Sequence, residues 1–273
     1  MEQAIPTKAL KISHEQPAAP ARRWRLFRVP GWEGILFILL LIGLWQGTTT
    51  WVKLPNPALF PSLPSILRAL KDSLPELLLG TLSSFRILVP GYFAAVAAGI
   101  AWGLLVGTTG WLHRAFSPFA RAVSPVPPTV YIPYAIALLP TFRLSAIFVV
   151  FIGAFWPVFL NTAAGAAAVP SRYRDNARIL GLSRLGYLRR VVFPASLPHI
   201  FSGMGVGLAL AFILLTVAKL FGANAGLGRF VQYYADFADY PRMAAGILYT
   251  GLVTLISMGL LELVRRRSLF WVR

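Results

Sequence analysis

The sequence predicts an all-α protein that is integral to a membrane, and its composition and hydropathy carry this prediction. Of the 273 residues, 57% are apolar or aromatic and only 13% are charged. In a soluble globular domain roughly a quarter of all residues are charged. This chain must therefore hold long stretches without charge. Six such stretches are about long enough to cross a hydrocarbon core of ~30 Å as helices. This composition argues against a cytosolic enzyme.

The six expected spans differ in how clearly the sequence marks them. They cover residues 34–52, 87–110, 122–139, 144–168, 200–218 and 244–261. The third is the weakest, because four prolines between residues 125 and 133 interrupt its backbone hydrogen bonding. A broken segment persists in a bilayer only where neighbouring helices or a wet cavity satisfy the freed carbonyls. We therefore expect the third segment to lie inside the bundle.

The segments between the spans have distinct characters. Residues 1–30 combine prolines, alanines and scattered basic groups, which predicts a disordered cytoplasmic tail in front of a transmembrane domain over 31–273. Residues 65–79 carry leucines at near-helical spacing with charges between them, which favours an amphipathic helix on the outer interface over a further span. Residues 222–241 hold five tyrosines and phenylalanines, typical of an aromatic belt at a membrane surface.

The net charge of +17 could indicate a nucleic-acid-binding protein, so the placement of the basic residues decides its meaning. With the N-terminus inside, eighteen basic residues fall on the cytoplasmic side of the expected spans and six on the outer side. This excess is the positive-inside bias of membrane proteins. The sequence therefore predicts a multi-pass protein with both termini in the cytoplasm and no nucleic-acid partner.

This chain lacks the residues that several kinds of chemistry require. It has no cysteine, and its three histidines lie far apart. Thiolate and imidazole metal sites are therefore not expected. It also lacks the Gly-x-x-x-x-Gly-Lys-Ser/Thr loop that cradles nucleotide phosphates. We expect no metal site, no catalytic residue and no cofactor bound by this chain.

The longest inner connection, residues 169–199, carries the most informative pattern. A helix is expected to begin near Ser171 and to end at Gly181 with a left-handed residue. A second short helix over 183–193 is expected to stop at the prolines that follow, where the chain restarts as the fifth span. The sequence thus predicts two short cytoplasmic helices between the fourth and fifth spans.

Six residues of this connection fall into a spaced pattern: Asp175, Ala177, Gly181, Val191, Phe193 and Pro194. The pattern is an acidic residue, an alanine two positions later, a glycine four after that, and an apolar-x-apolar-Pro ending. In this pattern the connection resembles the Glu-Ala-Ala loop of ABC importer permeases. Asp175 replaces the usual glutamate and Asn176 the usual first alanine, which are mild departures. Further runs, at 78–86, 99–107, 155–162 and 221–228, are similar to permeases of the nitrate, taurine and alkanesulfonate type, and the resemblance covers residues 58 to 264.

The resemblance implies a type I ABC importer permease fold of six transmembrane helices with a cytoplasmic coupling helix, in a bacterial inner membrane. It implies that the ATPase contacts Arg174, Asp175, Ala177, Arg178, Gly181 and Pro194. Small residues such as Ala177 and Gly181 let a partner approach the backbone, and Asp175 suits a helix N-terminus. The alternative for such an arginine- and leucine-rich loop is that it lies on anionic lipid.

The resemblance also implies partners and a mechanism. The partners are two cytoplasmic ABC ATPase subunits, which bind ATP and Mg, a second permease copy in a homodimer, an external solute-binding protein and membrane lipid. The chain itself is then a transporter subunit and not an enzyme. It moves a small, anionic solute inward by alternating access, with sulfonate, taurine and nitrate as candidates. Similar-looking permeases carry different solutes, so the substrate stays open.

Two further groups of residues are candidates for transport and assembly. Pro133, Asn161 and Lys219 are candidates for the translocation path. Lys219 replaces part of a common alanine-glutamate pair; it could attract an anion, or its side chain could extend to the outer surface. A second group, Gly99, Gly103 and Gly107, lies on one face of the second span and predicts close helix packing, within a dimer or within the chain.

Two other functions remain as alternatives. A secondary transporter would need carboxylates inside its spans, but Glu33 and Glu262 lie only at span edges. A membrane assembly protein that transports nothing would not need a docking loop with this spacing. Both alternatives therefore fit the sequence less well than an importer permease does.

Overall fold

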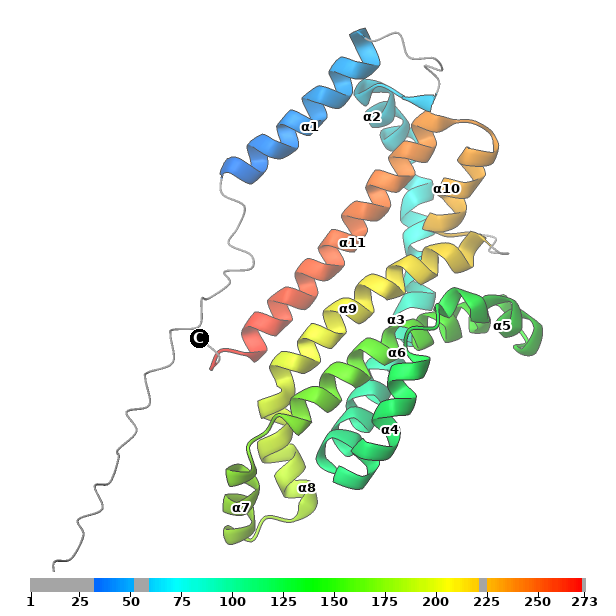
Figure 1. The fold of residues 1–273 in the computed structure, drawn as a ribbon. Coiled ribbons are helices and arrows are strands. Elements are labelled where there is room, and N and C mark those ends of the chain that lie inside the picture. Colours follow the sequence, from blue (N-terminus) through cyan, green and yellow to red (C-terminus); the bar gives the residue numbers. More distant parts are fainter. Residues whose placement is uncertain (1–31, 52–58, 221–224, 272–273) are drawn as a thin grey trace, which may run out of the picture. The chain divides into compact units, whose positions relative to one another are not determined.

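The computed structural model describes residues 32–51, 59–220 and 225–271, and the expected tail over 1–30 lies outside this part of the chain. All regular structure in the described residues is helical (Figure 1), which confirms the predicted all-α class. The chain forms two compact units, Met1–Trp51 and Val52–Arg273. The described part of the first unit is one largely apolar helix, α1 (Trp32–Trp51), which matches the first expected span within two residues.

Three long helices form the centre of the second unit. They are α3 (Leu74–Thr108), α6 (Phe142–Ala167) and α9 (Phe193–Leu220). α6 packs along both α3 and α9 and supplies Val150, Ala154 and Val158 to their common core. Ala95 of α3 and Ala211 of α9 fill the same core and are fully buried. Small and β-branched side chains therefore let the three helices lie close together.

α3 and α6 run in the same direction. At the start of α6, the Arg143 guanidinium donates a hydrogen bond of 3.3 Å to the carbonyl of Arg86 in α3. Near the end of both helices, Gly107 of α3 lies against the backbone of Ala163 in α6. The connection between two parallel helices has to return along the bundle. Three short pieces make this return: α4 (Gly110–Val123), the 3₁₀ turn η2 (Pro128–Tyr131) and α5 (Ile132–Leu138).

The segment over 122–139 is broken, as its prolines predict. Its longest helical run, η2 followed by α5, covers Pro128–Leu138 and is too short to cross a bilayer alone. The prolines at 125, 127 and 128 lack the N–H groups that would carry α4 onward. The described residues accordingly contain five helices long and apolar enough to cross a membrane. As expected for a broken segment, Ile132 and Ala135 of α5 are buried against Val149 and Leu214.

The inner connection differs from the expected pair of short helices. α7 (Ser171–Ile179) begins where expected, but α8 (Arg184–Tyr187) continues through a π-helical turn, η3 (Leu188–Val192), directly into α9. Pro194 and Pro198 do not end this helix. In the π turn, the Phe193 N–H donates to the Leu188 carbonyl five residues back. Prolines and π turns can each kink a helix without ending it, and here the π turn directly precedes Pro194.

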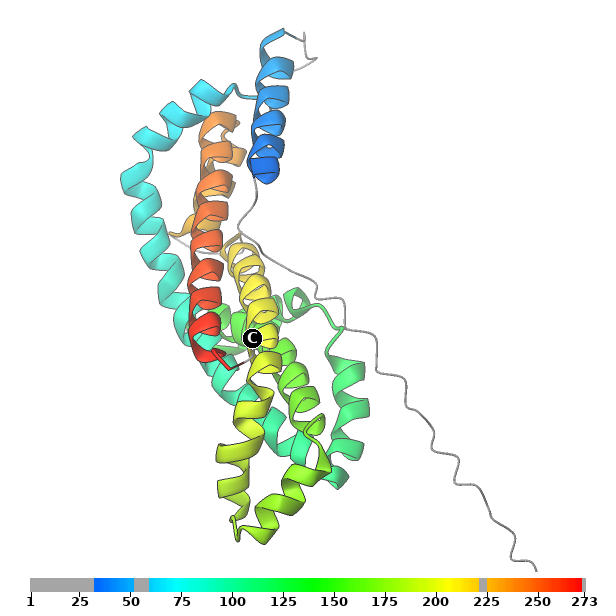
Figure 2. The same cartoon turned by 90° about the vertical axis from the view of Figure 1, so that its left-hand side faces the viewer.

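Two amphipathic helices and α11 complete the second unit. α2 (Leu63–Asp72) covers the first half of the amphipathic segment expected over 65–79, and the second half already belongs to α3. α10 (Leu227–Asp236) lies within the aromatic loop expected over 222–241, where no helix was predicted. α11 (Tyr240–Ser268) lies beside α9 and α10 (Figure 2). Ile66 and Ala69 of α2 pack against Ala245 of α11.

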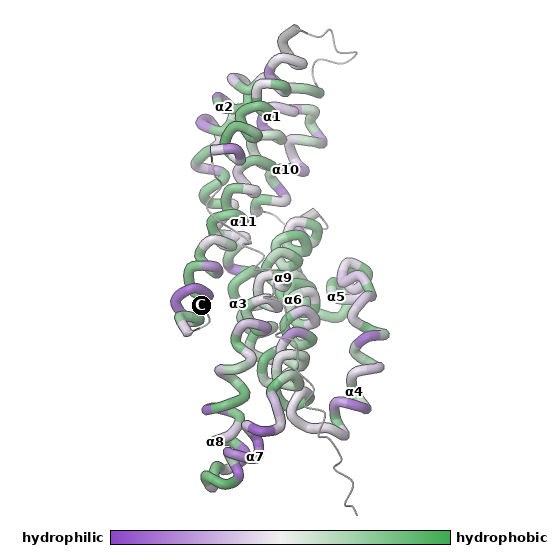
Figure 3. Tube along the Cα trace, turned by 60° about the vertical axis from the view of Figure 1, so that its left-hand side comes forward, coloured by the Kyte–Doolittle hydropathy of each residue, from purple (hydrophilic) through white to green (hydrophobic). Residues whose placement is uncertain are grey.

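Hydropathy is distributed unevenly along the second unit (Figure 3). The long helices are mainly hydrophobic, whereas hydrophilic residues gather on α7 and at the C-terminal end of α11. α11 exposes many leucine and isoleucine side chains, and Leu255 is 71% exposed. Such a face is suited to lipid or to another protein surface.

Candidate functional site

The end of α7 has the backbone geometry that the sequence predicts. Gly181 has a φ of +68°. The Leu182 N–H donates to the Ala177 carbonyl at 2.9 Å, and the Gly181 N–H donates to the Arg178 carbonyl at 3.0 Å. These two bonds form a Schellman cap, in which a glycine is favoured because its φ is positive. The left-handed end of this helix is confirmed.

The tip of α7 exposes two large apolar side chains that the sequence analysis did not single out. Ile179 is 83% exposed and Leu180 is 75% exposed. Both stand between the basic residues of α7 and the Gly181 cap, where apolar residues in a sequence are normally taken as core. Their position directly before a C-terminal glycine is the signal that could have identified them. We call Ile179 and Leu180 the apolar tip of α7.

The other residues assigned to ATPase contact fall into two groups. Arg174, Asp175 and Arg178 are exposed, and the Arg178–Asp175 ion pair, at 3.9 Å, has both side chains largely in solvent. Such a pair contributes little stability, so both groups can bind a partner. Ala177 is only 4% exposed, so it supports α7 from within and does not offer the small contact surface that we expected. Pro194 is half-buried in α9, within the continuous helix that leads away from α8.

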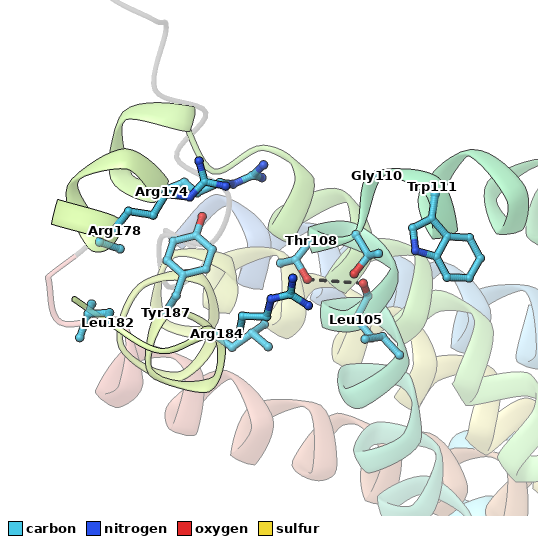
Figure 4. A pocket seen from close by; sticks show the side chains of 12 residues that line it. Leu105, Thr108, Gly110, Trp111, Arg174, Arg178, Leu182, Arg184 and Tyr187 are labelled. Atoms are coloured by element: carbon cyan, nitrogen blue, oxygen red, sulfur yellow. Dashed lines mark hydrogen bonds between the residues drawn. The ribbon is translucent and has the colours of Figure 1, made fainter. Parts of the chain in front are cut away.

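A cavity of about 510 Å³ lies between α7, α8 and the turn that joins α3 to α4. Arg174 and Arg178 of α7 and Arg184 of α8 line it, together with Tyr187 and Trp111. Figure 4 shows Arg184 extending toward Thr108 at the end of α3. The hydroxyl proton of Thr108 is already donated to the Leu104 carbonyl at 2.7 Å. The guanidinium groups are therefore the main hydrogen-bond donors of this cavity.

Lys219 is enclosed at the far end of α9, and its side chain does not extend to the surface. It is 1% exposed. Its ammonium donates to the Ala225 carbonyl at 2.7 Å and to the Ser83 hydroxyl at 3.0 Å. Gly226 has a φ of +127°, and a Cβ at this position would collide with the Lys219 ammonium. Lys219 thus fixes the start of α10 against α3.

The three candidates for the translocation path are not brought together. Pro133 is exposed on α5, whereas Asn161 of α6 faces Gly203 of α9. The Asn161 amide donates to the Pro157 carbonyl of its own helix at 2.9 Å. Gly203 precedes Lys219 by sixteen residues of α9, which is about 24 Å along a helix. Asn161 and Lys219 therefore lie far apart, each with its polar group bound within the chain.

The glycines at 99, 103 and 107 pack within the chain. A Cβ at Gly99 would lie 2.9 Å from a methyl group of Val158, and one at Gly103 would lie 2.5 Å from the Cβ of Thr162. A Cβ at Gly107 would lie 2.5 Å from the carbonyl oxygen of Ala163. All three contacts are with α6. The expected close packing is therefore internal, and this stripe is not a dimer interface.

At the opposite end from α7, a tyrosine joins α10 to α3. The Tyr234 hydroxyl donates to the Glu76 carboxylate at 3.1 Å, and the Arg242 guanidinium lies over the Tyr234 ring at 5.3 Å. Burial, followed by the charge of Glu76 and this hydrogen bond, raises the pKa of Tyr234. The hydroxyl therefore keeps its proton and remains a donor to Glu76 at neutral pH.

Removing the Lys219 ammonium is expected to destabilise the end of the protein that lies opposite α7. In Lys219→Met, the Ala225 carbonyl loses its donor at a cost of about 1–3 kcal/mol, so the melting temperature and solute uptake should fall together. Gly226→Ala is the matched variant, because it disturbs the same contact and keeps the charge. Both quantities can be measured on purified protein and in vesicles. Lost uptake at an unchanged melting temperature in Lys219→Met, with normal uptake in Gly226→Ala, would instead assign Lys219 to the path of the solute.

Comparisons with known proteins agree with this arrangement. Residues 95–269 match the family described as binding-protein-dependent transport system inner membrane component. The nitrate import permease NrtB of Leptolyngbya laminosa is 33% identical over 185 residues, which cover 68% of this chain and 66% of that protein. A putative aliphatic sulfonates transport permease, SsuC, of Bacillus subtilis (strain 168) is 27% identical over 250 residues, or 88% of each chain.

A solved structure supports the fold. A chain of the MetNI methionine ABC transporter, in an inward-facing conformation, matches with a TM-score of 0.63 and 16% identity, covering 72% of this chain and 98% of that chain. The predicted permease fold is thereby confirmed, with its third crossing made of short pieces. The chain belongs to the family of binding-protein-dependent transport system inner membrane components, the multi-pass permease subunits of ABC importers, in which a separate component is the ATPase.

Proposed function

We propose that this chain forms half of the membrane path of an importer that moves a small anion inward by alternating access. The two relatives described above are named for nitrate and for aliphatic sulfonates, which are both anions. A second copy of the chain completes the path, and an external solute-binding protein delivers the anion. Two ATPase subunits, which bind ATP and Mg, drive the cycle from the cytoplasm.

The apolar tip of α7 is the observation that carries the coupling role. Ile179 and Leu180 expose large hydrophobic side chains on a short helix that is otherwise polar. Apolar side chains held this far into solvent are typical of a protein partner surface. The tip enters a recess on the ATPase, and the exposed Arg174, Asp175 and Arg178 form the polar rim of that contact.

The orientation of the protein follows from the basic residues around this tip. The connection and the first turns after it contain six arginines, at positions 172, 174, 178, 184, 189 and 190. Arginine and lysine accumulate in the short cytoplasmic loops of membrane proteins. This supports a cytoplasmic position for α7 and for both termini, and an outer position for α2 and α10, where the solute-binding protein docks.

Vesicle transport tests this function directly. A tagged copy of the chain is purified from its own membranes together with its bound ATPase, and is reconstituted with the binding protein. We expect uptake of nitrate or of a sulfonate such as taurine when ATP and Mg are supplied, and none of a neutral amino acid. Uptake driven by an ion gradient without ATP would support a secondary transporter. An absence of any bound ATPase would support an assembly protein.

A further inference from the structure

The arginine-lined cavity beside α7 adjoins a second, apolar depression. The second depression has a volume of about 370 Å³ and lies between α3 and the run from α8 into α9. Leu104, Leu185 and Phe193 line it, and Arg189 is the only charged residue of its lining. Both depressions share Leu105 and Leu188. A polar recess therefore opens beside an apolar groove, and together we call them the composite pocket.

The polar part of the composite pocket carries an excess of positive charge. Arg174, Arg178 and Arg184 line it, and no aspartate or glutamate does. Among the ion pairs found in the described residues, Arg178 pairs with Asp175 at 3.9 Å, and neither Arg174 nor Arg184 takes part in any. Figure 4 shows the Tyr187 ring between Arg174 and Arg184. Clustered guanidinium groups of this kind match a phosphate group.

The surroundings of the composite pocket match a membrane interface. Trp111, which lines the polar part, is 65% exposed, and Trp102, one position along α3 from the groove residue Ala101, is 49% exposed. Tryptophan is enriched where a membrane protein meets the headgroup region of the bilayer. The groove side of the pocket therefore faces hydrocarbon and the arginines face the headgroups.

We propose that the composite pocket binds one anionic phospholipid of the cytoplasmic leaflet. Its phosphate lies against Arg174, Arg178 and Arg184, and an acyl chain lies in the groove of Leu104, Leu185 and Phe193. A free anion, or an acidic side chain of an ATPase, would use the arginines but would leave the groove empty. The proposal rests on the cytoplasmic position of α7 given above. The bound lipid joins the α3–α4 turn to α7 and holds the apolar tip in place.

Native mass spectrometry of the full-length protein tests the lipid site without any transport measurement. The protein in detergent is titrated with phosphatidylglycerol, and the retained lipid is counted. Arg174→Gln/Arg184→Gln should weaken phosphatidylglycerol binding about thirtyfold and leave zwitterionic phosphatidylcholine unaffected. Arg172→Gln/Arg190→Gln is the matched control on the same connection, outside the pocket lining, and should change the affinity less than about twofold. If Arg174→Gln/Arg184→Gln binds phosphatidylglycerol as tightly as the control double variant does, the proposal is wrong.

A second variant separates a lipid from a free anion. Ala101→Trp fills the groove beside Leu104 and leaves the polar part with Arg174, Arg178 and Arg184 unchanged, so it should weaken phosphatidylglycerol binding as well. If inorganic phosphate displaces the lipid at equal concentration and Ala101→Trp has no effect, the site takes a free anion and the lipid assignment is wrong. If Arg174→Gln/Arg184→Gln retains the lipid but loses the ATPase, the arginines bind protein and the proposal also fails.

Discussion

Replacing the apolar tip with aspartates, as Ile179→Asp/Leu180→Asp, is expected to abolish ATP-driven uptake. Both side chains are largely in solvent, at 83% and 75% exposure, so the change should leave the fold and its melting temperature intact. In a complex, the same positions would be enclosed by the ATPase, where two unpaired carboxylates cost several kcal/mol each. Uptake should fall at least about a hundredfold, and the ATPase should no longer copurify.

The control for this variant is Ser171→Asp/Asn176→Asp. It places the same two charges at exposed positions of the same helix and removes no apolar group. Uptake should then fall by no more than about threefold, since solvent screens charges at the rim of an interface. If the tip variant still binds the ATPase and transports, α7 is not the coupling helix.

Gly103→Leu is expected to disrupt the packing of α3 on α6. A Cβ at this position would already lie 2.5 Å from the Thr162 Cβ and 2.9 Å from the Phe159 carbonyl oxygen. Because the backbone of α6 supplies one of these contacts, the two helices have to separate, at a cost of about 3 kcal/mol or more. Thermal unfolding in detergent should show a large decrease in the melting temperature or no folded protein.

Gly251→Leu and Gly259→Leu in α11 are the matched controls for Gly103→Leu. A Cβ at either glycine would have no atom within 4 Å. These substitutions also replace glycine by a good helix former, so the melting temperature should stay the same or rise. A Gly103→Leu protein as stable as these controls would contradict the close packing of α3 on α6.

The sequence predicts those features that depend on neighbouring residues. The Schellman cap at Gly181 is an example, because one glycine after a short polar helix determines both of its hydrogen bonds. The repeat of glycines at 99, 103 and 107 likewise predicts close packing. Its partner could not be predicted, because the same repeat serves a dimer or a neighbouring helix of one chain.

Features that depend on distant contacts or on alternative backbone bonding were not predicted. Pro194 and Pro198 normally end a helix, but the π turn at 188–192 allows the helix to continue, and no residue in that turn signals it. The burial of Lys219 depends on Ser83 and Ala225, which are distant in sequence or belong to a following turn. The path of the chain from the end of α3 back to the start of α6 similarly depends on how α4 and α5 pack beside α6.

The uninterrupted helix from Arg184 to Lys219 has a mechanical consequence. It contains 36 residues, or about 54 Å of helix along its path, and it bends where α8 passes through the π turn into α9 (Figure 1). One end lies beside α7, the helix that we propose to couple to the ATPase, and the other end holds the turn before α10 through Lys219. If an ATPase moves α7, one continuous helical run can therefore carry that displacement to the turn before α10.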